Sequence, residues 1–385
     1  MTSSLDSFCA LTRRVRIDAG VQTIHIVLTE LAADLPEPVS DLARTATGCG
    51  IATSLPLATL KSQAECLEAL HYLQPPGAAL ARQGDGPTAV LLPLETPDRG
   101  TILAPIRVWP ALDLRHRQSL LLPEQVLFAA VPDGETRIRA ESNSSGMAFG
   151  DLGTDRAARS GLLELIERDA IFGAWLSGRR LPILNTSQAL TPLIAGVQAL
   201  GVDVLMLDAT SDLGVPVAIC ICSHAGRQIT FGTAAAGDMG QAMEKALLEA
   251  LQMRPFMEEY PAAKLDQVLS DRDVASFTAT DTALYWWSSG TLAAVTDHLM
   301  DPNPHQPTAH ASDSFPDLTE RLLQHNMTVV LADLSSDWLH AAGWQVVRVL
   351  VPDLLPAFTR ERDRPAFHPR WGDLRGAPKL PVPFA

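Results

Sequence analysis

The sequence is short of cysteine, of positive charge and of long apolar runs, and each shortage argues against a class of protein. Its 385 residues include only 5 cysteines, an odd number, mostly far apart, which disfavours a disulfide framework. Acidic residues outnumber basic ones by 44 to 30, and the net charge of −14 argues against a nucleic-acid-binding surface. No stretch approaches the roughly 20 apolar residues of a membrane helix. We therefore expect a soluble cytoplasmic protein.

Familiar catalytic motifs are also missing. The chain has no P-loop glycine pattern, no kinase catalytic-loop pattern and no nucleophile elbow. Any nucleotide site in this protein must therefore be of an unrelated design.

Hydrophobic patterning predicts an α/β or α+β mixture without internal repeats. With 46% hydrophobic residues the chain can bury a large core, in one globular unit or two closely joined lobes. Strands are predicted at residues 22–28, 89–94, 202–207, 215–222, 327–333 and 348–356. A segment rich in Pro, Ser and His, residues 301–318, is predicted as a surface loop. Cys220 and Cys222 are assigned to the core, because no second Cys or His pair completes a zinc set.

The middle of the chain places charged residues inside an apolar helix. The small residues of 144–150 predict a loop, and Thr154 is predicted to cap the helix that follows. Apolar residues then recur at helical spacing, so Glu164 and Glu167 share one face. Their like charges repel, and a buried carboxylate is costly without a partner. The pair therefore needs a counter-charge, such as a metal ion or Arg168.

A second acidic pair, Glu65 and Glu68, has the same spacing in the helical segment 58–73. Mg²⁺ takes oxygen ligands and usually keeps waters and substrate phosphates, so carboxylates from two facing helices could hold magnesium over a nucleotide. Two solvated helix faces are the alternative, and for Glu65 and Glu68 taken alone it explains the pattern equally well.

A third segment begins with glycine and alanine and becomes strongly helical after Asp238, its predicted N-cap. The proline that follows Arg254 should end or bend the helix there. Glu249, Gln252 and Arg254 would then cluster in its last turns, where they could bind an anion. On spacing alone, an ordinary amphipathic helix with a polar stripe is the better interpretation.

Taken together, these three segments resemble the YcaO family of ATP-using enzymes that modify peptide backbones. The resemblance extends over most of the chain and implies an α+β, YcaO-type fold, in which mixed sheets and helices surround an ATP cleft in a single catalytic domain of residues 1–385. It implies ATP and Mg²⁺ as cofactors. The implied metal ligands are Glu65, Glu68, Glu164 and Glu167, and the implied ATP-binding residues are Ser144, Ser145, Arg168, Glu249, Gln252 and Arg254.

Two positions depart from the family pattern. Arg156 stands where the family usually has Glu, and Ala69 stands where Arg is common. These departures leave open an alternative from another class, a catalytically weak ATP-binding scaffold within a peptide-modifying complex.

The last residues, 376–385, resemble the proline-rich tail of azoline-forming members, with Ala385 in place of the final proline. Polyproline geometry is stiff, so the resemblance implies that the tail holds the Ala385 carboxylate where it can accept a proton. The alternative is a frayed end. In either case we expect removal of residues 381–385 to change stability little.

The resemblance implies an ATP-dependent cyclodehydratase that converts Cys, Ser or Thr of a ribosomal precursor peptide into thiazoline or oxazoline. Thioamide- and amidine-forming members use the same ATP chemistry and remain alternatives. The implied partners are the precursor peptide, a separate leader-binding protein similar to ubiquitin-activating enzymes and, where azolines become azoles, a flavin-dependent dehydrogenase. The expected assembly is a homodimer or hetero-oligomer.

Overall fold

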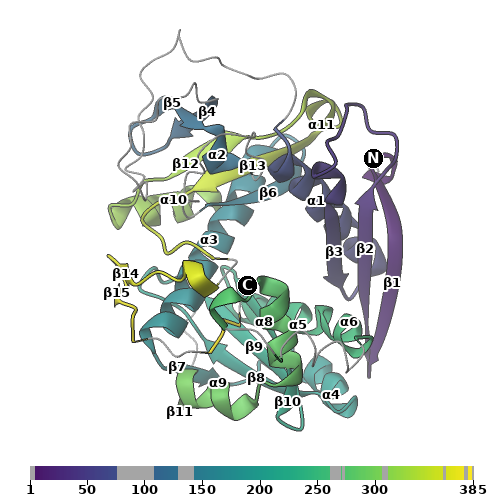
Figure 1. The fold of residues 1–385 in the computed structure, drawn as a ribbon, viewed down its shortest axis with the longest axis vertical. Helices are drawn as coiled ribbons and strands as arrows, with labels where there is room; N and C mark the ends of the chain where they lie inside the picture. Colours follow the sequence, from purple (N-terminus) through teal and green to yellow (C-terminus); the bar gives the residue numbers. More distant parts are fainter. Residues whose placement is uncertain are drawn as a thin grey trace. The chain divides into compact units, whose positions relative to one another are not determined.

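The computed structural model describes residues 5–75, 108–128, 143–260, 270, 274–305, 311–358, 361–376 and 380–383 (Figure 1). The strand predicted at 89–94 and the terminal Ala385 lie outside these ranges. The chain divides into two compact units. Unit 1 comprises Met1–Arg14, Ile26–Leu165 and Ser314–Pro356, and unit 2 comprises Val15–His25, Ile166–Asp313 and Ala357–Ala385. Both units combine helices with β-sheet, which confirms the α+β prediction.

Regular elements account for most of the described chain. The helices are α1 (Leu55–Leu73), α2 (Glu124–Leu127), α3 (Gly153–Ser177), α4 (Thr191–Ala199), α5 (Met239–Gln252), α6 (Arg254–Glu258), α8 (Ala279–Ser288), α9 (Leu292–Leu299), α10 (Phe315–Gln324) and α11 (Asp337–Ala341). The strands are β1 (Cys9–Ala19), β2 (Gln22–Leu31), β3 (Thr47–Ala52), β4 (Val108–Asp113), β5 (Gln118–Pro123), β6 (Asn143–Phe149), β7 (Leu181–Leu184), β8 (Asp203–Asp208), β9 (Val217–His224), β10 (Arg227–Ala235), β11 (Met300–His305), β12 (Val330–Asp333), β13 (Trp344–Leu350), β14 (Phe367–His368) and β15 (Gly372–Asp373). None of these helices combines the length and apolar character needed to cross a bilayer, in the part of the chain that is described.

Unit 1 contains an antiparallel five-stranded sheet in the order β5-β4-β12-β13-β6, and β3 packs against α1. Glycines on β3 allow its backbone to approach α1 closely. A Cβ atom at Gly48 or Gly50 would lie 1.9 or 2.0 Å from the backbone oxygen of Ser62 or Ala58 on α1. Gly146 on β6 has the same role toward α3, because its Cβ would lie 2.2 Å from the Ala157 oxygen. Side chains of α1 and α3 are thereby brought close to the backbone of β3 and β6.

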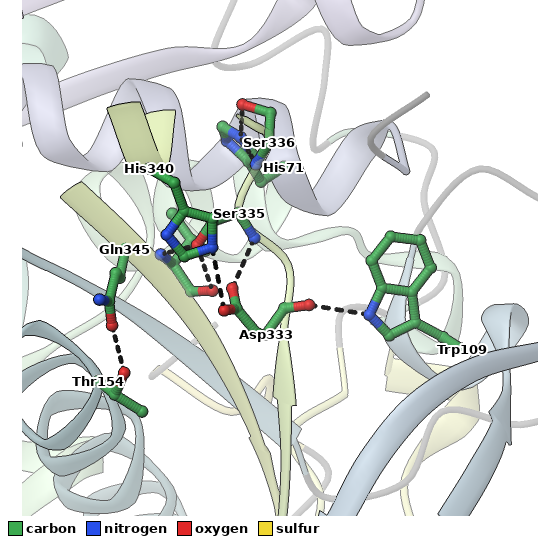
Figure 2. Close-up of polar contacts among 9 residues, drawn as sticks. His71, Trp109, Thr154, Asp333, Ser335, Ser336, His340 and Gln345 are labelled. Carbon is green, nitrogen blue, oxygen red and sulfur yellow. Dashed lines mark hydrogen bonds and ion pairs between the residues drawn. The ribbon is translucent and has the colours of Figure 1, made fainter. Parts of the chain in front are cut away.

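Polar contacts join α1 to the residues between β12 and α11, and the start of α3 to β13 (Figure 2). The His71 ring on α1 bonds the Leu67 oxygen through Nδ1 at 2.7 Å and the Ser336 hydroxyl through Nε2 at 3.1 Å. The Thr154 hydroxyl on α3 bonds the side chain of Gln345 on β13. Because α3 begins at Gly153, Thr154 lies in the first turn, and the prediction that it caps the helix was wrong.

Unit 2 contains a five-stranded sheet in the order β10-β9-β8-β7-β11, in which only β7 and β11 run parallel. Helix α5 packs against β9 and β10. Gly232 on β10 is required there, because its Cβ would lie 2.1 Å from the Ala246 oxygen of α5. Cys220 and Cys222 on β9 are fully buried free thiols, as their assignment to the core requires.

Two predicted loops are partly regular structure. The small residues of 144–150 form β6 up to Phe149, and only Gly150, with φ of +90°, makes the expected break. The segment 301–318 contains β11 up to His305 and enters α10 at Phe315, so the loop prediction was wrong over those parts. The prediction for the third helix was right. Asp238 caps α5, which ends at Gln252, and the proline that follows Arg254 starts the separate helix α6.

Candidate functional site

Three of the predicted metal ligands share one acidic neighbourhood in unit 1. Glu65 and Glu68 lie one helical turn apart on α1, and Glu164 lies on α3. Burial raises the pKa of both Glu65 and Glu68, and the charge of nearby Glu164 adds to the rise in each. These carboxylates are therefore close in space although about 100 residues separate them in sequence. The alternative of an independent solvated face does not account for Glu68, which is half-buried.

Two buried serines on β6 hold these carboxylates. The Ser145 hydroxyl donates to Glu68 Oε1 at 2.6 Å, and the Ser144 hydroxyl donates to Glu164 Oε2. The exposed fractions of Ser144 and Ser145 are only 3% and 6%. Both residues were predicted to bind ATP, but in the structure each hydroxyl is directed at a carboxylate.

Arg348 contributes a positive charge to this cluster and was not predicted from the sequence. Arg348 Nη1 donates to the Ser145 hydroxyl at 3.2 Å, and the guanidinium lies 4.3 Å from the centre of the Tyr72 ring. Only 7% of the residue is exposed. One signal could have revealed it, because a single arginine inside the apolar strand Val346–Leu350 needs a buried partner.

Burial dominates the electrostatics of the cluster. Burial and, after it, the charge of Glu164 together raise the pKa of Glu68 to about 7, against the opposing effects of the Ser145 hydrogen bond and the Arg348 charge. Part of the Glu65 side chain reaches solvent, yet desolvation of its carboxylate also raises its pKa. The Cys49 backbone N–H donates to Glu65 Oε2 at 3.0 Å and lowers that pKa. Binding of a cation would offset the repulsion among these carboxylates and favour their charged forms.

The donor set fits magnesium. Carboxylate oxygens are the hard ligands that Mg²⁺ prefers, and Mg²⁺ is usually bound by one or two carboxylates together with waters and substrate phosphates. In the described ranges, no group of three or more His, Cys, Asp or Glu is gathered tightly enough to hold a metal by itself. A metal at Glu65, Glu68 and Glu164 would therefore take part of its coordination from water or from a bound phosphate.

The fourth predicted ligand, Glu167, belongs to a second cluster in unit 2. Its carboxylate accepts hydrogen bonds from the Thr233 hydroxyl at 2.5 Å and from the Ala235 N–H at 3.0 Å. The Thr233 N–H donates to Glu249 Oε2 at 2.7 Å. Strand β10 thus joins Glu167 of α3 to Glu249 of α5. Neither Thr233 nor Ala235 was predicted, because their place on β10 gives no sequence signal.

The two other arginines predicted to bind ATP are removed from solvent, Arg168 in part and Arg254 almost completely. Arg168 is half-buried and directly follows Glu167 on α3. Arg254 is 5% exposed, donates to the Gln228 oxygen at 2.9 Å and lies 5.1 Å from the Trp287 ring centre. Burial lowers the pKa of Arg254. Gln252 ends α5 one residue before the bend and is half-buried.

The two residues that depart from the family pattern lie in different surroundings. Ala69 packs against the apolar core of unit 1. Arg156 is exposed in the first turn of α3.

The described part of the tail is bound. The Arg364 guanidinium donates to the Leu380 oxygen at 2.8 Å, Trp286 Nε1 donates to the Pro381 oxygen at 3.2 Å, and the Val382 N–H donates to Glu361. Val382 is only 1% exposed. The premise that removal of residues 381–385 takes little from a core is therefore wrong at Val382, which is buried. The proposed proton acceptor, Ala385, lies outside the described residues.

A comparison with protein families found one match. The model for "YcaO cyclodehydratase, ATP- and Mg2+-binding" matches residues 57–355, which contain every predicted site residue except Ala385. No match was found among curated protein sequences.

Solved structures of similar fold include three informative cases. A heterocyclase in complex with substrate and cofactor has a TM-score of 0.65 and 18% identity over 91% of this chain and 51% of that one. YcaO from Methanopyrus kandleri bound with AMPPCP and Mg2+ has a TM-score of 0.61 and 19% identity over 90% and 86%. The E. coli microcin synthetase McbBCD complex has a TM-score of 0.61 and 13% identity over 98% and 96%. This chain thus spans about half the length of the heterocyclase and nearly all of the other two matched chains.

Proposed function

This chain belongs to the YcaO family, and we propose that it is an ATP-dependent cyclodehydratase acting on the backbone of a ribosomal precursor peptide. It would convert Cys, Ser or Thr residues into thiazolines or oxazolines. One observation carries the proposal. Glu65, Glu68 and Glu164 share an acidic neighbourhood in which burial and mutual repulsion raise the pKa of Glu68 to about 7, as expected of a cluster that binds a cation.

We assign the metal to the carboxylates of Glu65, Glu68 and Glu164, and the role of Glu167 as a fourth ligand stays a prediction. When bound, Mg²⁺ would neutralise charge on the phosphates of ATP. Arg168 would contact phosphate, and Glu249, Gln252 and Arg254 would line the nucleotide site. Thr233 donates hydrogen bonds to both Glu167 and Glu249. These bonds fix the two carboxylates relative to each other, which supports a role for both in one site.

The reaction would proceed on the substrate peptide itself. A Cys, Ser or Thr side chain adds to the preceding amide carbonyl, and the resulting oxyanion takes the γ-phosphoryl group from ATP, releasing ADP. That addition already closes a five-membered ring, and loss of phosphate and of the amide proton then forms the C=N bond of the azoline, so that the peptide loses one water overall. The protein's contribution would be positioning and charge neutralisation, with Arg168 beside the transferring phosphoryl group. The Ala385 carboxylate stays our prediction for the proton acceptor.

We further propose that the chain works with partner proteins. A separate leader-binding protein, similar to ubiquitin-activating enzymes, would deliver the precursor, and a flavin-dependent dehydrogenase would oxidise the rings where azoles are the product. The pro-peptide bound to a microcin synthetase complex of the same fold supports a multi-protein assembly. Use of ATP and the presence of five free cysteines support a cytoplasmic location.

The test is mass spectrometry of the precursor peptide after incubation with the chain, its leader-binding partner, ATP and Mg²⁺. We expect loss of one water per ring, with one ADP formed for each. Glu164→Gln should abolish the conversion, because it removes charge from the acidic cluster. Glu320→Gln, at an exposed position on α10, is the matched control and should retain activity.

Other outcomes would assign the chain differently. Incorporation of sulfur without water loss would indicate a thioamide product, and a macrocycle would indicate an amidine. Nucleotide binding without any ADP formation in the complete mixture would reject the enzyme and favour the scaffold.

A further inference from the structure

A closed circuit of contacts surrounds Glu68. Its Oε1 accepts the Ser145 hydroxyl at 2.6 Å, and Arg348 Nη1 donates to the same hydroxyl at 3.2 Å. The Arg348 guanidinium lies 4.3 Å from the ring centre of Tyr72, which follows Glu68 by four residues on the same face of α1. The circuit therefore leaves α1, passes through β6 and β13, and returns to α1.

The circuit determines how the Ser145 hydroxyl is used. A serine hydroxyl has one hydrogen to donate, whereas arginine can only donate. Because Arg348 gives a hydrogen bond to the Ser145 oxygen, the hydroxyl hydrogen is directed to Glu68. Strand pairing fixes this arrangement, since Ser145 and Arg348 are directly opposite each other on β6 and β13. At 6% and 7% exposure, both residues have little room to reorient.

Ser144 makes the corresponding contact with a side chain of α3. Consecutive residues of a strand point to opposite faces, so Ser144 and Ser145 are directed to different sides of β6. Ser144 donates to Glu164 on α3, and Ser145 donates to Glu68 on α1. Gly146 confirms the alternation, because its Cβ would meet α3, on the side that Ser144 faces. One dipeptide thus orients a carboxylate on each of two helices.

We propose that Ser144, Ser145 and Arg348 are positioning residues for metal binding, which orient the carboxylates of Glu164 and Glu68 and do not bind the nucleotide directly. The proposal rests on the assigned metal site and departs from the expected ATP-binding role of the serines. Hydrogen-bond partners of metal ligands are commonly worth about 10- to 100-fold in metal affinity.

Calorimetric titration of Mg²⁺ into the chain, with a non-hydrolysable ATP analogue present, tests the proposal without relying on turnover. Ser144→Ala and Ser145→Ala should each weaken Mg²⁺ binding about 10- to 100-fold. Ser145→Thr keeps the hydroxyl and should restore most of the affinity. Thr154→Val is the matched control, because it removes a hydroxyl that also joins α3 to the β6-bearing sheet but lies outside the cluster (Figure 2). It should change the affinity less than about twofold.

Arg348→Met tests the circuit itself. If Arg348 acts through Ser145, the double variant Ser145→Ala with Arg348→Met should bind Mg²⁺ no more weakly than Ser145→Ala alone. Tyr72→Leu changes only a partly exposed ring, so it should fold normally, and loss of the cation–π contact should weaken Mg²⁺ binding about two- to fivefold.

Affinity for the ATP analogue in EDTA separates the two roles of the serines. If the serines only position the carboxylates, Ser144→Ala and Ser145→Ala should leave this metal-free affinity unchanged. If they bind the nucleotide directly, the same substitutions should lower it. The proposal is overturned if Ser145→Ala and Tyr72→Leu leave Mg²⁺ binding unchanged, or if the serine variants lose metal-free nucleotide affinity. Failure of the wild-type chain to bind Mg²⁺ with the analogue would instead reject the metal site on which the proposal rests.

Discussion

At the residue scale, the carboxylates of the acidic cluster lower the stability of the fold, and the same negative charges allow it to bind a cation. A carboxylate whose pKa is raised to about 7 in the folded chain is destabilising when it ionises, because the unfolded chain gives up the proton more easily. Such a group is retained where charge is needed for binding, which is a recognised conflict between stability and function.

Glu68→Gln should therefore stabilise the metal-free protein. The gain in free energy of unfolding should be small below pH 4.5 and should grow between pH 4.5 and 7. Above pH 7 it should reach about 1–3 kcal/mol. Chemical denaturation in EDTA between pH 4.5 and 8.5 measures this, with Glu320→Gln as the exposed control. Addition of Mg²⁺ with nucleotide should stabilise the wild type but not the variant. A variant that is less stable than the wild type at pH 8 would contradict the assignment of a crowded carboxylate.

His71 should give a pH dependence of the opposite sign. Burial lowers its pKa to about 4, and its Nε2 faces the Ser336 hydroxyl while Nδ1 donates to the Leu67 oxygen, an arrangement that suits the neutral ring (Figure 2). Because an unfolded histidine protonates near pH 6.5, stability should be fully present above that pH and fall by about 3 kcal/mol as the pH drops to 4. His71→Leu should flatten this part of the stability profile, whereas His325→Gln, at an exposed position, should leave it unchanged.

At the scale of elements, the sequence was informative about helices and poor on short strands. The spacing of apolar residues predicted α1, α3 and α5, of which α5 buries one face while residues 169–176 of α3 are buried on every side. The segment 144–150 was assigned to a loop because Ser and Gly favour turns. In the structure Gly146 is small because β6 lies against α3 and leaves no room for a Cβ atom, and Ser144 and Ser145 donate to carboxylates. Composition could not distinguish these two reasons for small residues.

The tail allows a prediction at the same scale. Val382 is almost fully buried, so Val382→Ala should destabilise the protein by about 2 kcal/mol. Trp286→Phe removes the N–H that donates to the Pro381 oxygen and also shrinks a fully buried ring system, and should cost about 2–4 kcal/mol. Denaturant titration measures both. Pro383→Ala, at a half-buried position, should have the smallest effect of the three. Equal stability of all three variants and the wild type would show that the tail is not held as described.

At the scale of the whole molecule, the predicted site residues fall into separate clusters that the sequence could name but not assemble. The acidic pairs were evident from spacing, since Glu65 with Glu68 and Glu164 with Glu167 each lie one turn apart. Their partners were not, because Ser145, Arg348 and Thr233 reach them from strands distant in sequence. Hydrogen bonds of this kind depend on strand register, for which a single sequence carries little information.

The distribution of free thiols has a consequence for measuring how this chain unfolds. Cys9 and Cys66 are buried in unit 1, Cys220 and Cys222 are buried in unit 2, and Cys49 is partly exposed. A pulse of alkylating reagent should modify Cys49 at once, whereas the other four should react only when their surroundings open. Mass spectrometry of the labelled peptides would follow both units in one sample, without an added probe. Equal labelling rates for the two buried pairs would indicate one cooperative transition, and unequal rates would identify the unit that opens first.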